Sequence, residues 1–132
     1  MVGIDIVSVS KIKNKTDSFL KKIFTLNELE YAFIKENPYQ TLAGIYALKE
    51  AVLKAYDLNI SYIKNCRIEV IHVKNHPEIL IDGQVCDAFV SISHDKGRAV
   101  AICITKDKEK PKIDESMINL LPQRNKESHK GS

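Results

Sequence analysis

The sequence contains no tryptophan, only five glycines and only three cysteines among its 132 residues. Cys66, Cys86 and Cys103 form no C-x-x-C pair and are odd in number, which argues against a disulfide framework and against a structural zinc site. We expect structural thiols in a reducing compartment. No apolar run approaches the roughly 18 to 20 residues of a membrane span, and the N-terminus lacks a basic segment followed by an apolar one. These absences predict an intracellular, cytoplasmic protein without a membrane segment.

The length and composition fit one globular domain, since 44% of the residues are hydrophobic and 28% are charged. The net charge of +3 is small but unevenly distributed. Residues 11–22 carry five lysines against Asp17, a local balance of +4, whereas the rest of residues 1–105 sums to −3. This local basic segment is either a solvated helix face or a weak nucleic-acid-binding patch.

Hydrophobic periodicity predicts helices in the first half of the chain. Residues 2–9 alternate as a strand, and Ser10 is a plausible N-cap for one helix that continues to residue 23. Thr25 and Glu28 match a capping box, which starts a second helix that ends at about residue 36.

A third helix is expected over residues 40–57. Gly44 in its interior costs up to about 1 kcal/mol relative to alanine, so a close contact with another element or a ligand would explain that glycine. The pattern places Lys49, Glu50 and Lys54 on sectors away from the apolar face. The apolar face consists of Leu42, Ile45, Leu48, Val52 and Ala55.

The second half alternates as strands over residues 66–73, 78–81, 88–93 and 98–105. Asp82-Gly83 forms a turn, and the four residues 94–97 suit a tight antiparallel hairpin. We therefore expect an α+β domain over residues 1–105, in which a small antiparallel sheet packs against helices. Beyond it, a Lys-, Asp- and Glu-rich segment with a proline predicts a linker over 106–119.

Asp5 lies in an apolar run, where an isolated carboxylate needs a partner that offsets its desolvation. Glu50 and Lys54 share a helix face at i, i+4. A Mg²⁺ ion bound by one or two carboxylates completes its shell with waters and phosphates, so Asp5 and Glu50 could hold it while Lys54 neutralises phosphate charge. In the alternative interpretation these are structural ion pairs, of which an exposed one contributes only about 0.3 to 0.5 kcal/mol, and His94 is an ordinary turn residue.

Five segments carry a more specific signal in their order along the chain. They are Gly3-Ile4-Asp5-Ile6-Val7, Ile23-Phe24-Thr25-Leu26-Asn27-Glu28-Leu29, Leu42-Ala43-Gly44, Lys49-Glu50-Ala51-x-x-Lys54-Ala55 and Val90-Ser91-Ile92-Ser93-His94. Together they resemble the holo-[acyl-carrier-protein] synthases of the 4′-phosphopantetheinyl transferase family, over about residues 1–105. The K-E-A-x-x-K-A run is the most specific element.

The resemblance implies a magnesium-dependent transferase of fatty acid biosynthesis. Such an enzyme moves the 4′-phosphopantetheine arm of coenzyme A onto a serine of apo acyl carrier protein and releases 3′,5′-ADP. It also implies the transferase fold and a homotrimer with sites at subunit interfaces, without nucleic-acid or membrane partners. The resemblance implies that Asp5 and Glu50 are metal ligands and that Asp5, Glu50 and Lys54 are catalytic residues. It places Lys49, Lys54 and His94 at coenzyme A, and Lys11, Lys15 and Lys22 at the acidic carrier protein.

Three positions depart from the family pattern. Ile45 stands where the family usually has arginine, and Lys11 replaces another arginine, which keeps the charge but loses bidentate geometry. The usual glycine-rich turn after the third helix reads Asp57-Leu58-Asn59-Ile60, in which Asn59 tolerates a left-handed conformation. We expect the Ile45 change and the altered turn to weaken coenzyme A binding.

Two rival functions remain open at this point. A non-catalytic basic module that binds nucleic acid or an acidic protein predicts salt-dependent binding without a need for Mg²⁺. A second rival is a transferase subtype that acts on a larger synthase, although such enzymes are typically twice as long. Separately, residues 120–131 resemble the opening of an ADP-dependent NAD(P)H-hydrate dehydratase domain. That resemblance predicts the N-terminal part of a fusion enzyme, and a disordered extension is the alternative.

Overall fold

A computed structural model describes residues 1–106 of the chain. The elements in chain order are β1 (Val2–Ser8), α1 (Val9–Lys13), α2 (Asp17–Ile23), α3 (Leu26–Phe33), α4 (Pro38–Tyr56), α5 (Ser61–Lys64), β2 (Ile68–Val73), β3 (His76–Ile81), β4 (Gln84–Val85), β5 (Ala88–Asp95) and β6 (Arg98–Thr105). The linker expected beyond residue 106 and the tail segment 120–132 lie outside the described residues. Among the described helices, none combines the length and apolarity needed to cross a membrane.

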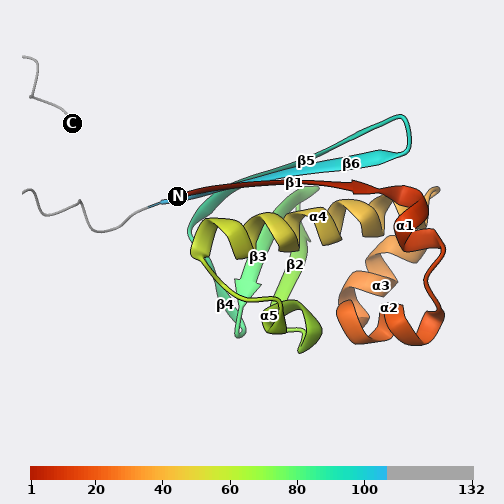
Figure 1. The fold of residues 1–132 in the computed structure, drawn as a ribbon, viewed down its shortest axis with the longest axis horizontal. Helices are drawn as coiled ribbons and strands as arrows, with labels where there is room; N and C mark the ends of the chain where they lie inside the picture. The colour runs from red at the N-terminus through yellow and green to blue at the C-terminus, as the bar shows by residue number, and fades with distance from the viewer. Residues whose placement is uncertain (107–132) are drawn as a thin grey trace, which may run out of the picture.

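The strands form two three-stranded sheets, ordered β1-β6-β5 and β2-β3-β4, and all their pairings are antiparallel. Helix α4 runs along one side of the β1-β6-β5 sheet, and the β2-β3-β4 sheet lies on that same side (Figure 1). The α+β class is therefore confirmed, although the chain builds two sheets where the alternation predicted one. The core between these layers includes Val7, Leu42, Ile45, Leu48, Val52, Ile68, Ile79, Ala101 and Cys103.

Gly3 sets the close packing of β1 against α4. A Cβ atom at this position would lie 1.9 Å from the carbonyl oxygen of Ala51 and 2.9 Å from the amide nitrogen of Ala55. Only glycine permits this approach of strand backbone to helix backbone. Because side chains alternate along a strand, Asp5 projects from the same face as Gly3 and is carried to the surface of α4.

Helix α4 forms as predicted, with local signals at both ends. The Asn37 side chain accepts a hydrogen bond from the amide of Gln40, and Pro38 occupies the first turn, where its missing N–H costs nothing. At the other end Asp57 adopts a left-handed conformation with φ of 55°, and the amide of Leu58 bonds to the carbonyl of Leu53. The left-handed residue of this turn is thus Asp57, not Asn59 as the sequence suggested.

The prediction of a single helix over residues 10–23 is wrong. The chain forms two short helices, α1 and α2, and Thr16 starts the second by accepting a hydrogen bond from the amide of Phe19 at 3.1 Å. Ser8, not Ser10, occupies the N-cap position of α1, although its hydroxyl bonds to Ser10 and not to the backbone. The local cap at Thr16 therefore overrides the apolar periodicity that ran across both segments.

The second-half strands differ from expectation mainly at their turns. Lys96 and Gly97 both have positive φ and form a two-residue turn, so β5 and β6 extend to Asp95 and Arg98, as is typical of type I′ hairpins. His94 therefore lies inside β5 opposite Ala99 and not at the tip of a four-residue loop. The first of these strands, β2, begins at Ile68 and not at residue 66, because Cys66 has a positive φ that a strand does not accommodate.

The three cysteines are free thiols, as the sequence predicted. Burial raises the pKa of Cys66 and Cys86, and it raises the pKa of Cys103 to about 11. Thiols held in the protonated form are poor nucleophiles and poor metal ligands. Cys103 is fully buried in the core, and Cys66 and Cys86 are partly buried.

The β1-β6-β5 sheet leaves one face uncovered by any described helix or strand (Figure 1). We call this surface the outer sheet face. Its residues align in rows across the three strands, because Ile4 is opposite Ile102 and Val100 is opposite Ile6. The apolar residues of the outer sheet face are Val2, Ile4, Ile6, Phe89, Val100, Ile102 and Ile104.

Candidate active site

Asp5 and Lys54 form an ion pair between β1 and α4. The Lys54 ammonium lies 3.1 Å from the carboxylate Oδ1 of Asp5 and also donates to the carbonyl oxygen of Ile4 at 2.9 Å. The Asp5 side chain is 19% exposed and that of Lys54 is 53% exposed. Two groups separated by 49 residues in the sequence are thus brought together, with the lysine still open to solvent.

Glu50 joins this cluster through Tyr46, one turn earlier on α4. Burial raises the pKa of Tyr46 to about 12, with further contributions from a hydrogen bond to Glu50 and from the negative charges of Glu50 and Asp5. Both carboxylates therefore lie close enough to act on the same phenol. The ammonium of Lys11 lies 5.9 Å from the centre of the Tyr46 ring, which adds a second cation at the edge of the cluster.

The donor set of this cluster fits Mg²⁺. Asp5 and Glu50 offer carboxylate oxygens, which Mg²⁺ prefers, and the ion commonly takes only one or two protein carboxylates with waters and substrate phosphates. Within residues 1–106 no group of three or more His, Cys, Asp or Glu side chains converges on one point. A site for Mg²⁺ here therefore depends on phosphate oxygens from a substrate, and Lys54 would have to share Asp5 with the ion.

Lys49 does not join the cluster, and the prediction that it lies away from the apolar face is wrong. Its side chain has no exposed surface, and its ammonium bonds to Oε1 of Glu28 at 2.6 Å and to the carbonyl oxygen of Ile23 at 2.8 Å. Direct contact with a ligand would require this ion pair to open. Lys49 therefore packs the end of α2 and the start of α3 against α4.

Glu28 is the centre of that buried network. One oxygen accepts the amide hydrogen of Thr25, which completes the capping box predicted from the sequence, and the other accepts that of Val70 in β2. Burial raises the pKa of Glu28, while Lys49 and the two amides act in the opposite direction. One carboxylate thus links α3, α4 and β2.

The basic segment lies on exposed surface around α1 and α2. Lys11 belongs to α1, Lys15 follows it, and Lys22 belongs to α2. Lys15 sits with its ammonium 5.0 Å from the centre of the Phe19 ring, which is itself partly exposed. A cationic surface with an apolar side chain between its lysines is suited to an acidic protein partner.

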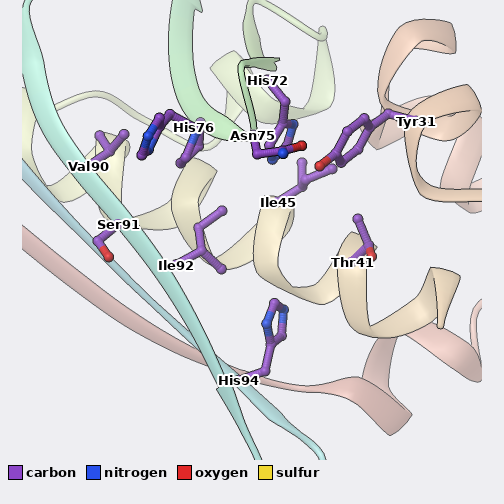
Figure 2. Close-up of a pocket in the computed structure, with 11 residues that line it drawn as sticks. Tyr31, Thr41, Ile45, His72, Asn75, His76, Val90, Ser91, Ile92 and His94 are labelled. Carbon is purple, nitrogen blue, oxygen red and sulfur yellow. The ribbon is translucent and has the colours of Figure 1, made fainter. Parts of the chain in front are cut away.

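A cavity of about 340 Å³ lies between α3, α4 and the strands β2, β3 and β5 (Figure 2). Thr41 and Ile45 contribute from α4, and His94 projects toward that helix from β5 (Figure 2). His94 packs against Gly44, where a Cβ would lie 2.8 Å from the ring nitrogen Nε2. The close contact that Gly44 predicted is therefore with β5. The other lining residues are Tyr31, His72, Asn75, His76, Pro77, Val90, Ser91 and Ile92.

Sequence reasoning did not find Tyr46 or the gathering of histidines. Tyr46 could have been found by its four-residue spacing from Glu50, which places both on one face of the helix. His72, His76 and His94 come from three different strands, and no local pattern indicates that such residues meet. The Ile45 departure lies at the same cavity, where its side chain is almost wholly buried.

Comparisons with known proteins agree with this geometry. The model of the 4′-phosphopantetheinyl transferase superfamily matches residues 1–104. The holo-[acyl-carrier-protein] synthase of Carboxydothermus hydrogenoformans is 40% identical over 115 residues, which cover 77% of this chain and 94% of that protein. The synthase of Thermodesulfovibrio yellowstonii is also 40% identical, over 111 residues that cover 78% of this chain and 95% of that protein.

Solved structures show the same fold. The Helicobacter pylori holo-[acyl-carrier-protein] synthase in complex with coenzyme A superimposes with a TM-score of 0.68 at 30% identity, over 80% of this chain and 100% of that chain. The Bacillus anthracis synthase gives a TM-score of 0.64 at 31% identity, over 77% and 91% of the two chains. The chain therefore belongs to the 4′-phosphopantetheinyl transferase superfamily and, within it, to the holo-[acyl-carrier-protein] synthases.

Proposed function

We propose that the protein transfers 4′-phosphopantetheine from coenzyme A to a serine of apo acyl carrier protein, with Mg²⁺, and releases 3′,5′-ADP. The observation that carries the proposal is the convergence of Asp5, Glu50 and Lys54 from segments about 45 residues apart, in a chain that belongs to this family. The coenzyme A complex of the Helicobacter pylori relative supports the choice of substrate.

Asp5 and Glu50 would hold the metal ion. When bound, Mg²⁺ supplies charge neutralisation at the diphosphate of coenzyme A. Tyr46 remains protonated at neutral pH, since its pKa is about 12, so its hydroxyl would donate to the Glu50 carboxylate without adding negative charge. The exposed Lys54 ammonium would contact the phosphate oxygens and stabilise the charge that develops on them.

In the transfer the serine oxygen forms a bond to the β-phosphorus, and the bond between that phosphorus and the bridging oxygen of 3′,5′-ADP breaks. The serine proton passes to a carboxylate or to a water at the site. The negative charge that moves onto the leaving phosphate is stabilised by Lys54, one helical turn from Glu50.

The histidine-lined cavity would take the nucleotide end of coenzyme A, with His94 toward a phosphate. The cavity adjoins β5, whereas Asp5 lies on β1, and these are the two edge strands of the β1-β6-β5 sheet. One coenzyme A molecule that touches both sites is therefore more readily bound between two chains, one of which contributes β1 and the other β5. This arrangement supports a homotrimer with its sites at subunit interfaces.

The outer sheet face would be the surface buried in that trimer. A contiguous row of exposed apolar side chains normally marks an interaction site. The position of this face across β1, β6 and β5 would place the two edges of neighbouring sheets near each other. The exposed lysines Lys11, Lys15 and Lys22 remain outside this face and would receive the acidic carrier protein. Complementary charge there would speed and orient docking.

Val100→Lys is expected to dissociate the trimer and to abolish transfer. Val100 lies in the central strand of the outer sheet face and is 36% exposed, so a lysine there would bury a charge on assembly. The measurement is molar mass by light scattering coupled to size exclusion, alongside transfer activity. The matched control is Val85→Lys on β4, which is 63% exposed and outside that face. A wild-type protein that is monomeric and active would contradict the trimer.

The proposed activity is tested by intact-mass spectrometry of apo acyl carrier protein incubated with this protein and coenzyme A, in Mg²⁺ and in EDTA. We expect the mass of one phosphopantetheine to be added only in Mg²⁺. A folded enzyme that leaves the carrier unmodified, when another transferase modifies the same carrier, would overturn the proposal. Binding of nucleic acid that weakens steeply with salt would then favour a basic binding module.

A further inference from the structure

The cavity between α4 and β5 contains no lysine, arginine or carboxylate among its lining residues. The only titratable groups in the lining are the imidazoles of His72, His76 and His94 and the phenol of Tyr31. A phosphate that enters this cavity therefore meets no permanent positive charge from its walls. Any charge compensation by the lining must come from a protonated histidine.

A hydrogen bond to α4 fixes the tautomer of the neutral His94 ring. Its ring nitrogen Nε2 lies 3.0 Å from the carbonyl oxygen of Gln40, and because a carbonyl oxygen only accepts hydrogen bonds, Nε2 must carry the hydrogen. In the neutral ring the other nitrogen, Nδ1, then holds a lone pair and would repel a phosphate oxygen. His94 can donate to a phosphate through Nδ1 only after it has taken up a second proton.

The other two histidines lack this constraint. His72 stacks on Tyr31 with ring centroids 3.9 Å apart and an interplanar angle of 7°; burial, and then the charge of Lys35, lower the pKa of His72. His76 is exposed at the start of β3, and within residues 1–106 its ring makes no hydrogen bond to another side chain, so its neutral form can turn an N–H toward a phosphate without gaining a proton.

The groups that face His94 do not compete with a phosphate for it. Helix α4 presents the Gln40 carbonyl and Gly44, and β6 presents the paired Ala99. Asp95, the next residue on β5, is paired in the strand register with Arg98. Across the cavity lie His72, His76 and Tyr31, and the ammonium of Lys35 is 4.6 Å from the centre of the Tyr31 ring.

We propose that the phosphate of the nucleotide enters this cavity together with one proton, and that His94 takes up this proton. The inference rests on the proposed function, because it deepens the recognition of the nucleotide end of coenzyme A. It predicts that affinity for a nucleotide phosphate falls as the pH rises. A site that used a fixed arginine or lysine would not show this dependence.

The test is isothermal titration of adenosine 3′,5′-bisphosphate into the full chain, in EDTA and between pH 7.0 and 8.5. Phosphate monoesters have their second pKa at about 6, so the ligand itself changes little over this range. Repeating the titration in two buffers of different ionisation enthalpy measures proton uptake. We expect uptake that approaches one proton per site and an affinity that falls by up to about tenfold per pH unit.

Two substitutions at His94 separate charge from packing. His94→Gln retains an N–H for the Gln40 carbonyl but should lose proton uptake and the pH dependence. His94→Lys carries a permanent charge and should bind with an affinity that is flat from pH 7.0 to 8.5. The matched control His76→Gln should retain the wild-type slope. Since His94 and His76 are both exposed, thermal melting should show all three variants folded.

The outcomes distinguish this inference from the function on which it rests. Wild-type binding without proton uptake would overturn the inference and leave the proposed transferase standing. A slope that survives in His94→Gln but disappears in His76→Gln would also overturn it. Failure of the wild-type protein to bind the bisphosphate at any pH would instead count against the proposed coenzyme A site itself.

Discussion

Glu50→Gln is expected to lower the rate of phosphopantetheine transfer by at least about a hundredfold while the fold is retained. The change keeps the side-chain volume but replaces an anionic oxygen ligand by a neutral amide. Loss of one group that stabilises transition-state charge typically costs a factor of about 10² to 10³. Glu50 has no buried ion pair to lose, so the helix should keep its packing. The measurement is the initial rate of holo-carrier formation over a Mg²⁺ titration, with circular dichroism for the fold.

The matched control for this variant is Glu36→Gln. Glu36 is an exposed glutamate in the connection between α3 and α4, so its change alters net charge by the same amount outside the cluster. We expect wild-type rates from this control. Near-normal turnover by a folded Glu50→Gln protein, with unchanged Mg²⁺ dependence, would remove Glu50 from the metal site.

Lys49→Met is expected to destabilise the protein by about 3 to 5 kcal/mol, because it leaves the buried Glu28 carboxylate without its cation. The ammonium lies 2.6 Å from Glu28 and both side chains have no exposed surface. The measurement is urea unfolding at a fixed protein concentration, since assembly also contributes to apparent stability. A loss of this size is a large part of the stability of a typical domain.

The control is the double variant Lys49→Met with Glu28→Gln, which removes both charges. We expect it to recover part of the loss, and not all of it, because the amides of Thr25 and Val70 also depend on the carboxylate. The same proteins decide between a structural and a ligand-binding role for Lys49. A Lys49→Met protein that unfolds like the wild type but binds coenzyme A more weakly would show that Lys49 contacts the ligand after all.

The local features of this fold could be predicted because their causes lie within a few residues. The capping box at Thr25 and Glu28 satisfies backbone groups one turn apart, and the apolar period of α4 predicts its buried face. The pairing of Glu50 and Lys54 on one helix face follows from the same geometry. At Thr16 two local signals compete, because the side chain caps a new helix while the apolar period continues across it. The apolar period alone predicted one helix where the chain forms two.

The candidate site was predictable only in its parts. The apolar setting of Asp5 indicated a partner that offsets its desolvation, and the structure supplies the ammonium of Lys54. The sequence does not show that Gly3 brings β1 onto the backbone of α4, which is what joins these two residues. Tyr46 was missed although its four-residue spacing from Glu50 on α4 could have indicated it. The meeting of His94 with His72 and His76 was missed because the three come from different strands, and such contacts depend on packing and not on spacing along the chain.

The sequence by itself determined the α+β class, the capping box of α3, the apolar face of α4 and, through its motifs, the family to which the chain belongs. Only the tertiary structure decided which charged groups are buried and which remain free. Lys49 and Lys54 lie five residues apart on one helix, yet one is enclosed with Glu28 and the other is exposed beside Asp5. The physical reason is that the cost of burying a charge depends on the groups that surround it, and those groups come from α2, α3, β1 and β2.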